Sequence, residues 1–175
     1  MVNISIRRKN KKKSCKNKTI KKHDNCNGVC VLHKNDNNIK GTIHLFEKTN
    51  GVFIKYNIKG LSDGEHGFHI HTYGDLTDGC NSACAHYNPH HKKHGGLHSK
   101  ERHLGDLGNI TSKNKISKGS LLAKNVSLTK KHPIIGRMLI IHKDKDDLGR
   151  GHDEESSKTG NAGKRLACGV IGLCS

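Results

Sequence analysis

Residues 42–58 of this 175-residue chain, TIHLFEKTNGVFIKYNI, are the clearest indication of its fold class. It contains two short runs rich in β-branched and aromatic residues, Thr42–Glu47 and Val52–Ile58. Between the runs stands Asn50–Gly51, a dipeptide that favours the tight turn of a β-hairpin. The stretch therefore predicts two antiparallel strands.

Six further runs of the same kind lie on either side of this hairpin, at a spacing of about ten residues. They are Val29–Leu32, Gly67–His71, Leu107–Thr111, Leu121–Leu128, Ile134–Ile141 and Cys168–Leu173. Turn signals separate them, for example at Asn35–Asn38 and Asp63–Gly64. No run keeps a helical period, so eight short strands predict an all-β antiparallel barrel or sandwich.

Two intervals, residues 72–106 and 143–167, break the regular spacing of the strands. Both are rich in Gly, His, Asp and Lys. Long segments without regular structure are uncommon in compact domains and usually carry function. We therefore expect the functional residues in these two loops and at the strand ends beside them.

The composition predicts a thin hydrophobic core. Only 31% of the residues are hydrophobic, 3% are aromatic, and there is no Trp. No stretch approaches the roughly 20 apolar residues that a membrane-spanning helix needs, so no membrane association is expected. A core of this kind calls for support from a metal or a disulfide, and 15 His and seven Cys are present.

The net charge of +17 is divided unevenly along the chain. Residues 1–25 hold ten Lys and Arg and one Asp, which predicts a disordered basic arm ahead of a folded domain at 26–175. Either the arm binds nucleic acid or acts as a nuclear address, or it is a solvated leader. No apolar segment typical of a secretion signal follows it, so we expect a cytoplasmic protein, with the nucleus as the alternative.

Histidines gather in the first long loop and in the strand before it. Nine of the 15 lie between His66 and His103, and His69 and His71 form an H-x-H pair. Residues i and i+2 of a strand point to the same face, so both imidazoles can reach one ion. His86, His94, His103 and Asp106 follow in a Gly-rich segment that can fold around a second ion. Imidazole favours copper, zinc or iron; a low-complexity tract that sequesters metal is the alternative.

Six stretches carry a specific resemblance to the copper/zinc superoxide dismutase family. They are GFHIHTYGD (Gly67–Asp75), GCNSACAHYNP (Gly79–Pro89), KHGG (Lys93–Gly96), ERHLGDLGN (Glu101–Asn109), IIGRMLIIHKDKDDLGRG (Ile134–Gly151) and EESSKTGNAGKRLACGVIG (Glu154–Gly172). The likeness runs from near Val29 to the C-terminus. It implies a Greek-key barrel of eight strands and the conversion of superoxide to dioxygen and hydrogen peroxide.

The resemblance also implies one copper and one zinc ion per subunit and assigns their ligands. Copper takes His69, His71, His86 and His142, and zinc takes His86, His94, His103 and Asp106. His86 is then shared by the two ions and is catalytic. Asp146 matches a carboxylate that joins a copper histidine to a zinc histidine, and such outer partners fix ring orientation.

Further positions of the family are matched around the site. Arg165 corresponds to the catalytic guanidinium that positions the anionic substrate. Glu154, Glu155, Lys158 and Thr159 correspond to the loop that shapes the substrate channel. Cys80 and Cys168 correspond to the intramolecular disulfide. The alternative function is a copper-handling protein that loads metal without dismutase activity, although such proteins often lack a complete copper set.

The remaining cysteines and histidines receive no catalytic role. Cys30 matches a buried thiol on the first strand, whereas Cys15, Cys26, Cys84 and Cys174 have no counterpart. Cys84 is expected to be an inert loop thiol, with competition for the disulfide or for copper as the alternative. His90, His91 and His98 are expected to be solvated. A homodimer is expected through Gly74, Asp75, Ile135, Gly136, Val170 and Leu173.

Overall fold

The computed structural model describes residues 26–32 and 38–175, and over these residues the chain forms eight strands and two short helices. The strands are β1 (Gly28–Leu32), β2 (Lys40–Lys48), β3 (Gly51–Lys59), β4 (Gly64–His71), β5 (Asp106–Ser112), β6 (Ile116–Lys124), β7 (Met138–His142) and β8 (Arg165–Leu173). The helices are the 3-10 turn η1 (Asn81–Ala83) and α1 (Glu154–Thr159). The predicted basic arm and Cys15 lie outside the described residues.

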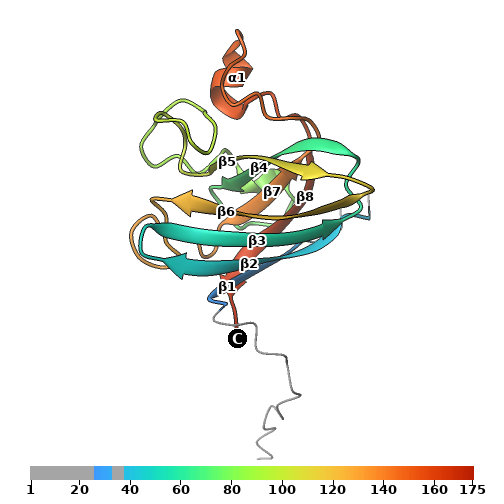
Figure 1. Ribbon diagram of the computed structural model, residues 1–175. Helices are drawn as coiled ribbons and strands as arrows, with labels where there is room; N and C mark the ends of the chain where they lie inside the picture. Colours follow the sequence, from blue (N-terminus) through green and yellow to red (C-terminus); the bar gives the residue numbers. More distant parts are fainter. Residues whose placement is uncertain (1–25, 33–37) are drawn as a thin grey trace, which may run out of the picture.

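All strand pairs in the sheet are antiparallel, in the order β5-β4-β7-β8-β1-β2-β3-β6. The pairs β1–β8, β4–β7 and β3–β6 join strands that are distant in the chain, as in a Greek key. The two outer strands, β5 and β6, follow each other through a tight turn, so the sheet curves into a nearly closed barrel (Figure 1). The predicted all-β class and the hairpin at Asn50–Gly51 are confirmed.

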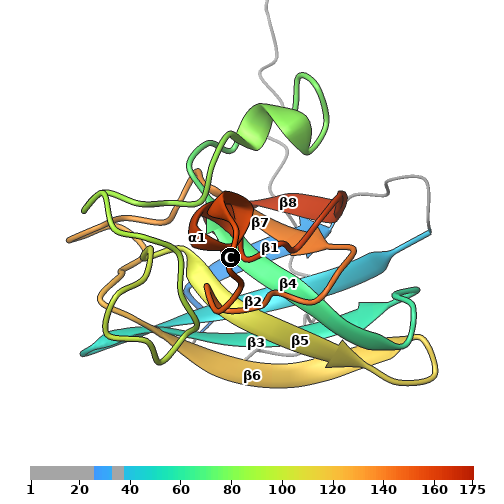
Figure 2. The ribbon, with the colours of Figure 1, turned by 90° about the horizontal axis from the view of Figure 1, so that it is seen from above.

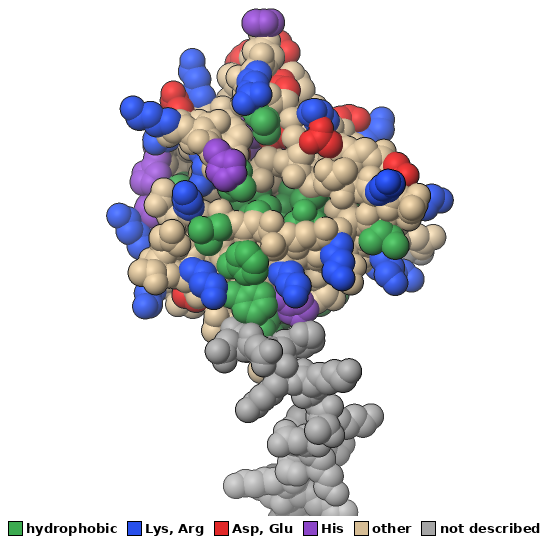
Figure 3. Space-filling model, viewed as in Figure 1, with side chains coloured by type: hydrophobic (Ala, Val, Ile, Leu, Met, Phe, Trp, Pro, Cys, Tyr) green, Lys and Arg blue, Asp and Glu red, His purple; other side chains and the backbone are tan. Residues whose placement is uncertain are grey.

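The barrel interior is filled mainly by Ile, Leu and Val, with Phe68 as the largest fully buried side chain. Viewed from above, the strands curve around this common interior, with α1 at the near end (Figure 2). On the face shown in Figure 3, Lys and Arg side chains are spread around the surface, and hydrophobic side chains lie near the centre and in the lower middle of the face. Among the described residues, no helix has the length and apolar character needed to cross a membrane.

Two predicted strands extend beyond the strands of the structure. The run Leu121–Leu128 was expected as a strand, but β6 ends at Lys124 because the backbone of Asn125 turns with φ 65°. The run Ile134–Ile141 was also expected as a strand, yet its first half is a turn closed by a hydrogen bond from the Arg137 amide to the Ile134 carbonyl. Val126, Leu128 and Ile134 are buried without being in a strand, and Ile135 is partly buried.

The second long loop contains a helix that the absence of a helical period did not predict. With only six residues, α1 is too short to show that period. Its ends are fixed locally instead. Asp153 caps the first turn by accepting a hydrogen bond from the Ser156 amide, and Gly160 closes the last turn with φ 69°. A Cβ at Gly160 would also collide with the Asp146 carboxylate.

Candidate metal centre

Strand pairing positions one half of the centre. His69 and His71 alternate with Phe68 and Ile70 along β4, so the core residues point into the barrel and the imidazoles point to its outer face. β4 pairs with β7, whose last residue is His142. The three histidines are therefore held by the sheet before any loop contributes.

The first long loop covers this outer face and supplies the other half. His86 forms an isolated antiparallel bridge with His71, which brings its ring against the strand histidines. His94 and His103 come from the same loop, and Asp106 opens β5 opposite His69. All of these side chains are buried. Residues that are widely separated in the sequence thus meet in one place.

The predicted copper ligands form one compact group. The ligand atoms of His69, His71, His86 and His142 all lie within 4.8 Å of one another. His71 directs Nδ1 to the carbonyl of Cys84 at 2.7 Å, and His142 directs Nδ1 to the carbonyl of Gly163 at 3.0 Å. Because Nδ1–H donates in both rings, the two Nε2 atoms carry lone pairs, and these atoms face each other at 3.3 Å.

The predicted zinc ligands form a second group that shares His86 with the first. Oδ1 of Asp106 lies 2.9, 3.0 and 3.1 Å from Nδ1 of His86, His94 and His103, respectively. Its other oxygen accepts hydrogen bonds from the amides of Gly95 and His103. Three ring nitrogens and one carboxylate oxygen make up a donor set typical of tetrahedral zinc.

Asp146 links the two groups. Its Oδ2 lies 2.8 Å from Nε2 of His69, and its Oδ1 lies 2.8 Å from Nε2 of His94. The Asn109 side chain holds the backbone of Asp146 on both sides, because it donates to its carbonyl and accepts from its amide. Since Nε2 of each histidine donates to Asp146, Nδ1 is the atom left to face the centre.

Burial keeps the strand histidines neutral. It lowers the pKa of His69 and of His71 well below the ordinary value, and it lowers the pKa of His142 to about 4. Metal ions bind the neutral form of imidazole. These three side chains are therefore ready to act as ligands at neutral pH.

The loop side of the centre is dominated by carboxylates. Burial lowers the pKa of His94, but its contacts with Asp106 and Asp146 outweigh this effect and raise the pKa to about 9. Burial by itself favours the protonated form of Asp106, yet hydrogen bonds from His103 and His86 hold its pKa below the usual range. A positive charge is thus favoured at the point where the three Nδ1 atoms meet.

The buried polar atoms test whether metal ions fit the two groups. Within the described part of the chain, Nδ1 of His69, Nε2 of His86 and Nδ1 of His94 have no hydrogen-bond partner. Nδ1 of His94 is close to Asp106, but not in a direction that makes a hydrogen bond. Unpartnered buried nitrogens are costly, and these three point into the two groups. The residues present therefore fit two metal ions.

Arg165 begins β8 and lies beside His142, across a bulge in the β7–β8 ladder. Its guanidinium donates to the carbonyls of Cys80, Asn81 and Cys84, at 2.7, 2.9 and 2.5 Å. Three carbonyls of the first loop thus fix one cation above the histidines. Burial lowers the pKa of Arg165, which still leaves it charged at neutral pH.

A pocket of about 970 Å³ opens from the histidines to the surface beside Arg165. Its described lining includes five cationic side chains and one carboxylate, namely Lys92, Lys93, Lys158, Lys164, Arg165 and Glu155. Thr159 also lines the pocket. Of the four predicted channel residues, Glu154 lies outside this lining and forms an exposed ion pair with Lys158 at 2.6 Å. The pocket is suited to a small anion.

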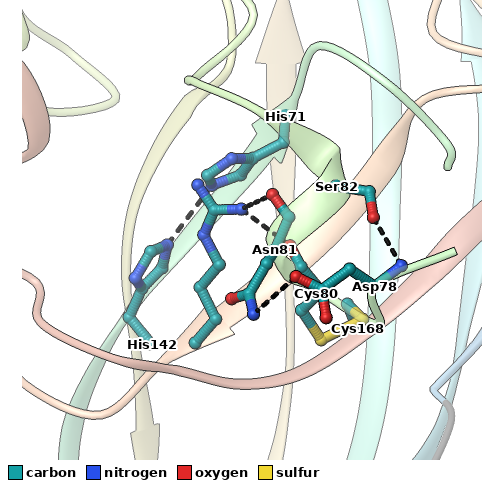
Figure 4. Close-up of a disulfide and its surroundings, with 8 residues drawn as sticks. His71, Asp78, Cys80, Asn81, Ser82, His142 and Cys168 are labelled. Atoms are coloured by element: carbon teal, nitrogen blue, oxygen red, sulfur yellow. Dashed lines mark hydrogen bonds between the residues drawn. A yellow bond between two sulfur atoms is a disulfide. The ribbon is translucent and has the colours of Figure 1, made fainter. Parts of the chain in front are cut away.

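A disulfide joins Cys80 in the first loop to Cys168 in β8. It packs with Ala83, Met138 and Ile140 in a small apolar cluster on the outer face of the sheet. Figure 4 shows the disulfide beside Asn81, with His71 and His142 facing each other nearby. The bond holds the loop segment whose carbonyls fix Arg165.

The remaining cysteines and histidines are placed as follows. Cys30 is buried, Cys84 is exposed, and Cys26 and Cys174 are partly buried. His90, His91 and His98 are exposed, although His91 reaches the rim of the pocket. Sequence reasoning missed the carbonyls of Cys84 and Gly163, which orient two of the histidines. A backbone carbonyl is present at every residue, so no residue type signals such a role.

The antiparallel barrel and its two adjoining histidine-rich groups place the chain in the class of metal-binding β-barrel proteins. The family profile described as "Copper/zinc superoxide dismutase (SODC)" matches residues 39–171. The chain therefore belongs to the copper/zinc superoxide dismutase family, a family of oxidoreductases that use copper and zinc. The resemblance found in the sequence is confirmed.

Several relatives are similar over most of the chain. "Superoxide dismutase [Cu-Zn] A" of Xenopus laevis is 48% identical over 147 residues, 83% of this chain and 97% of that protein. "Superoxide dismutase [Cu-Zn]" of Paramecium bursaria Chlorella virus 1 is 53% identical over 136 residues, 77% of this chain and 73% of that protein. "Extracellular superoxide dismutase [Cu-Zn]" of Brugia pahangi is 47% identical over 149 residues, covering 83% and 75%.

Proposed function

We propose that this chain converts superoxide to dioxygen and hydrogen peroxide at the centre described above, with the metals divided as follows. Copper is held by His69, His71, His86 and His142, and zinc by His86, His94, His103 and Asp106. The three unpartnered buried nitrogens carry this assignment, because each faces one of the two groups. When bound, copper supplies two oxidation states that alternate as successive superoxide ions are oxidised and reduced, whereas zinc has no redox chemistry.

His86 is the catalytic histidine in this proposal. Its Nδ1 lies in the zinc group near Asp106 and its Nε2 lies in the copper group. The ring therefore has one nitrogen for each site. Nε2 has no protein partner among the described residues, so it is free to take up a proton and to give it to the reduced product.

Asp146 acts as a positioning residue. It touches neither the substrate pocket nor the shared histidine, but it fixes the tautomers of His69 and His94 from the far side of their rings. A change in the position of one ring is transmitted to the other through its carboxylate. This link fixes the position of the two metal groups relative to each other.

Arg165 is the anion-binding residue. Its three carbonyl partners aim the guanidinium at the pocket next to His142, where a superoxide ion would meet it. The surrounding lysines give the pocket an excess of positive charge, which raises the encounter rate of a small anion and makes that rate depend on salt. Superoxide dismutase is a known example of such steering.

The experiment that tests the function is a superoxide decay assay on protein with a measured metal content. Protein with one copper and one zinc per chain should accelerate the decay, and Arg165→Ala should lower the rate about tenfold or more without changing metal content. Arg150→Ala removes an exposed arginine outside the pocket and serves as the matched control. If fully loaded protein left the decay unchanged, the chain would be a metal-handling protein instead.

A homodimer is proposed through a surface at one side of the barrel. The expected contact residues are Gly74, Asp75, Ile135, Gly136, Val170 and Leu173. Gly74 packs so closely on Gly136 that a Cβ would strike its carbonyl, and Leu173 is 69% exposed. Leu173→Glu should therefore produce monomers in sedimentation experiments. Ile116→Glu, at an exposed position on β6, is the control; a Leu173→Glu variant that stayed dimeric would contradict this surface.

The basic arm, residues 1–25, is proposed as a segment separate from the barrel domain at 26–175. Its charge and the start of the family match at residue 39 support this division. If the arm binds nucleic acid, its removal should abolish retention on DNA at low salt. Retention that is unchanged without the arm would contradict that role. The cytoplasmic location, with the nucleus as alternative, stays a prediction, because the relatives include a protein named as extracellular.

A further inference from the structure

Two strand ends and the middle of a third strand bring two cysteines and a histidine together, at residues with no part in the metal centre. Cys26 lies two residues before β1, His44 lies in β2, and Cys174 directly follows β8. β1 stands between β2 and β8 in the sheet. The Asn27 amide donates to the Leu45 carbonyl and the Cys174 amide donates to the Asn27 carbonyl, so the ladder continues to the end of the chain.

The ligand atoms of these three side chains form a compact group. Sγ of Cys26, one ring nitrogen of His44 and Sγ of Cys174 all lie within 4.8 Å of one another. Sγ of Cys26 is 3.5 Å from Nδ1 of His44 and 3.1 Å from the carbonyl of Gly28. All three side chains are partly buried. The C-terminus lies at the end of the barrel opposite α1 (Figure 1), so the group is remote from the second long loop.

Two thiols and one imidazole define the chemistry that this group can perform. Thiolate and imidazole prefer soft or borderline cations such as Cu⁺ and Zn²⁺, whereas Mg²⁺ and Ca²⁺ require oxygen ligands. Donors bound to one zinc ion are about 3.5–4 Å apart, given its bond lengths to sulfur and nitrogen. The group therefore needs only about 1 Å of closure, which partly exposed side chains can supply. A set of two Cys and one His with water in the fourth position is known for zinc.

We propose that Cys26, His44 and Cys174 bind one thiophilic cation, Zn²⁺ or Cu⁺, in addition to the two ions of the histidine centre. The alternative is a disulfide between Cys26 and Cys174. A disulfide needs no third donor, and the imidazole beside the thiol pair therefore favours the cation. The site would tie the N-terminal end of β1 to both of its neighbouring strands.

The test uses the full chain, already loaded with one copper and one zinc, in an oxygen-free solution with a reductant. Zn²⁺ is titrated into one sample and Cu⁺ into another, and the metal that stays bound after dialysis is counted. We expect a third equivalent to bind, and Co²⁺ used in place of Zn²⁺ should give the near-ultraviolet absorption of a cobalt–thiolate bond. The titration in which a third equivalent binds identifies the cation.

Matched variants assign the third equivalent to residues. The double variant Cys26→Ser with Cys174→Ser should lose at least about 100-fold in affinity, since loss of a ligand costs more than loss of an outer partner. His44→Gln keeps both thiols and should weaken binding about tenfold or more. Cys15→Ser and Cys84→Ser, which remove thiols outside the group, should keep the third ion. The two ions of the histidine centre report that each variant is folded.

Three results would overturn the proposal. The first is a reduced wild-type chain that binds two ions and no more. The second is a third ion that binds the double serine variant with unchanged affinity. The third is loss of the third ion from Cys15→Ser or Cys84→Ser, which would move the site to another thiol.

Discussion

The two long loops of the barrel are fixed by different kinds of interaction. The first, residues 72–105, has one turn of 3-10 helix and is tied down by the disulfide and by its contacts with Asp106. The second, residues 143–164, contains α1 with caps at both ends. Within this second loop, the Asp147 carboxylate also accepts hydrogen bonds from the Ser156 hydroxyl and the Asn161 side-chain amide.

The contrast between the two loops indicates which parts of the centre depend on metal. The strand histidines are placed by the β4–β7 ladder. The second loop is held mainly by hydrogen bonds within itself, although Asp146 and the Ser157 carbonyl also contact His94. His94 and His103 belong to a loop with little regular structure of its own, and they converge on a single carboxylate oxygen. We therefore expect the first loop to be the part that zinc organises.

The largest effect is expected from removing zinc. Loss of zinc removes the divalent ion that three ring nitrogens and Asp106 would surround, so the free energy of unfolding should fall by more than about 5 kcal/mol. Hydrogen exchange should rise through residues 72–105 and much less through 143–164. Denaturant unfolding of zinc-only and metal-free protein, with exchange measured on both, checks this prediction.

Asp106→Ala is the matched control for zinc removal. Without the carboxylate, added zinc should no longer stabilise the chain, because one of the four ligands is lost. Equal exchange in both loops on zinc removal would contradict this prediction, because the second loop would then depend on the ion as much as the first.

The next effect in size concerns the disulfide. Cys80→Ser together with Cys168→Ser should lower the free energy of unfolding by about 2–5 kcal/mol, since the bond spans a sequence separation of 88 residues. The activity should also fall, because two of the carbonyls that hold Arg165 are those of Cys80 and Asn81. Urea unfolding and a superoxide decay assay measure the two effects.

Cys84→Ser provides the comparison for the disulfide variant. It changes an exposed thiol of the same loop that is not in the bond, and its effect on unfolding should stay within about 0.5 kcal/mol. A larger effect would mean that the Cys84 thiol competes with Cys80 for Cys168, the alternative that the sequence left open.

A smaller effect is expected at Asp146, the residue that links the two loops. Asp146→Asn replaces the carboxylate whose two oxygens accept hydrogen bonds from His69 and His94. The affinity for copper should therefore fall about 10- to 100-fold. A competition titration with a copper chelator measures it. Asp144→Asn, at an exposed carboxylate two residues away, should leave the affinity unchanged. An unchanged affinity in Asp146→Asn would show that the ladder orients His69 without help.

The features predicted from the sequence are those that depend on residue type, such as which side chains share a face. The features that were missed depend on the backbone, such as where a strand begins or ends. The H-x-H pair indicates two imidazoles on one face of a strand, and the structure has them on β4. The last residue of β6 and the first residue of β7 could not be predicted. Leu128 and Ile134 are apolar and buried like strand residues, but they are buried outside the strands by contacts distant in sequence. The assignment of particular histidines to particular metals came from the family resemblance, since periodicity and spacing carry no such information.

The smallest effect is expected at the cap of α1. Asp153→Ala removes the side chain that accepts from the Ser156 amide and from Asn161, so the melting temperature should fall by roughly 2–4 °C. Asn is an equally good N-cap, and Asp153→Asn should therefore restore most of the loss. Because Asp153 forms its hydrogen bonds within the second loop and to no metal ligand, the decrease should be the same with and without zinc. A decrease that appeared only in the zinc-free protein would mean that the two loops are stabilised as one unit.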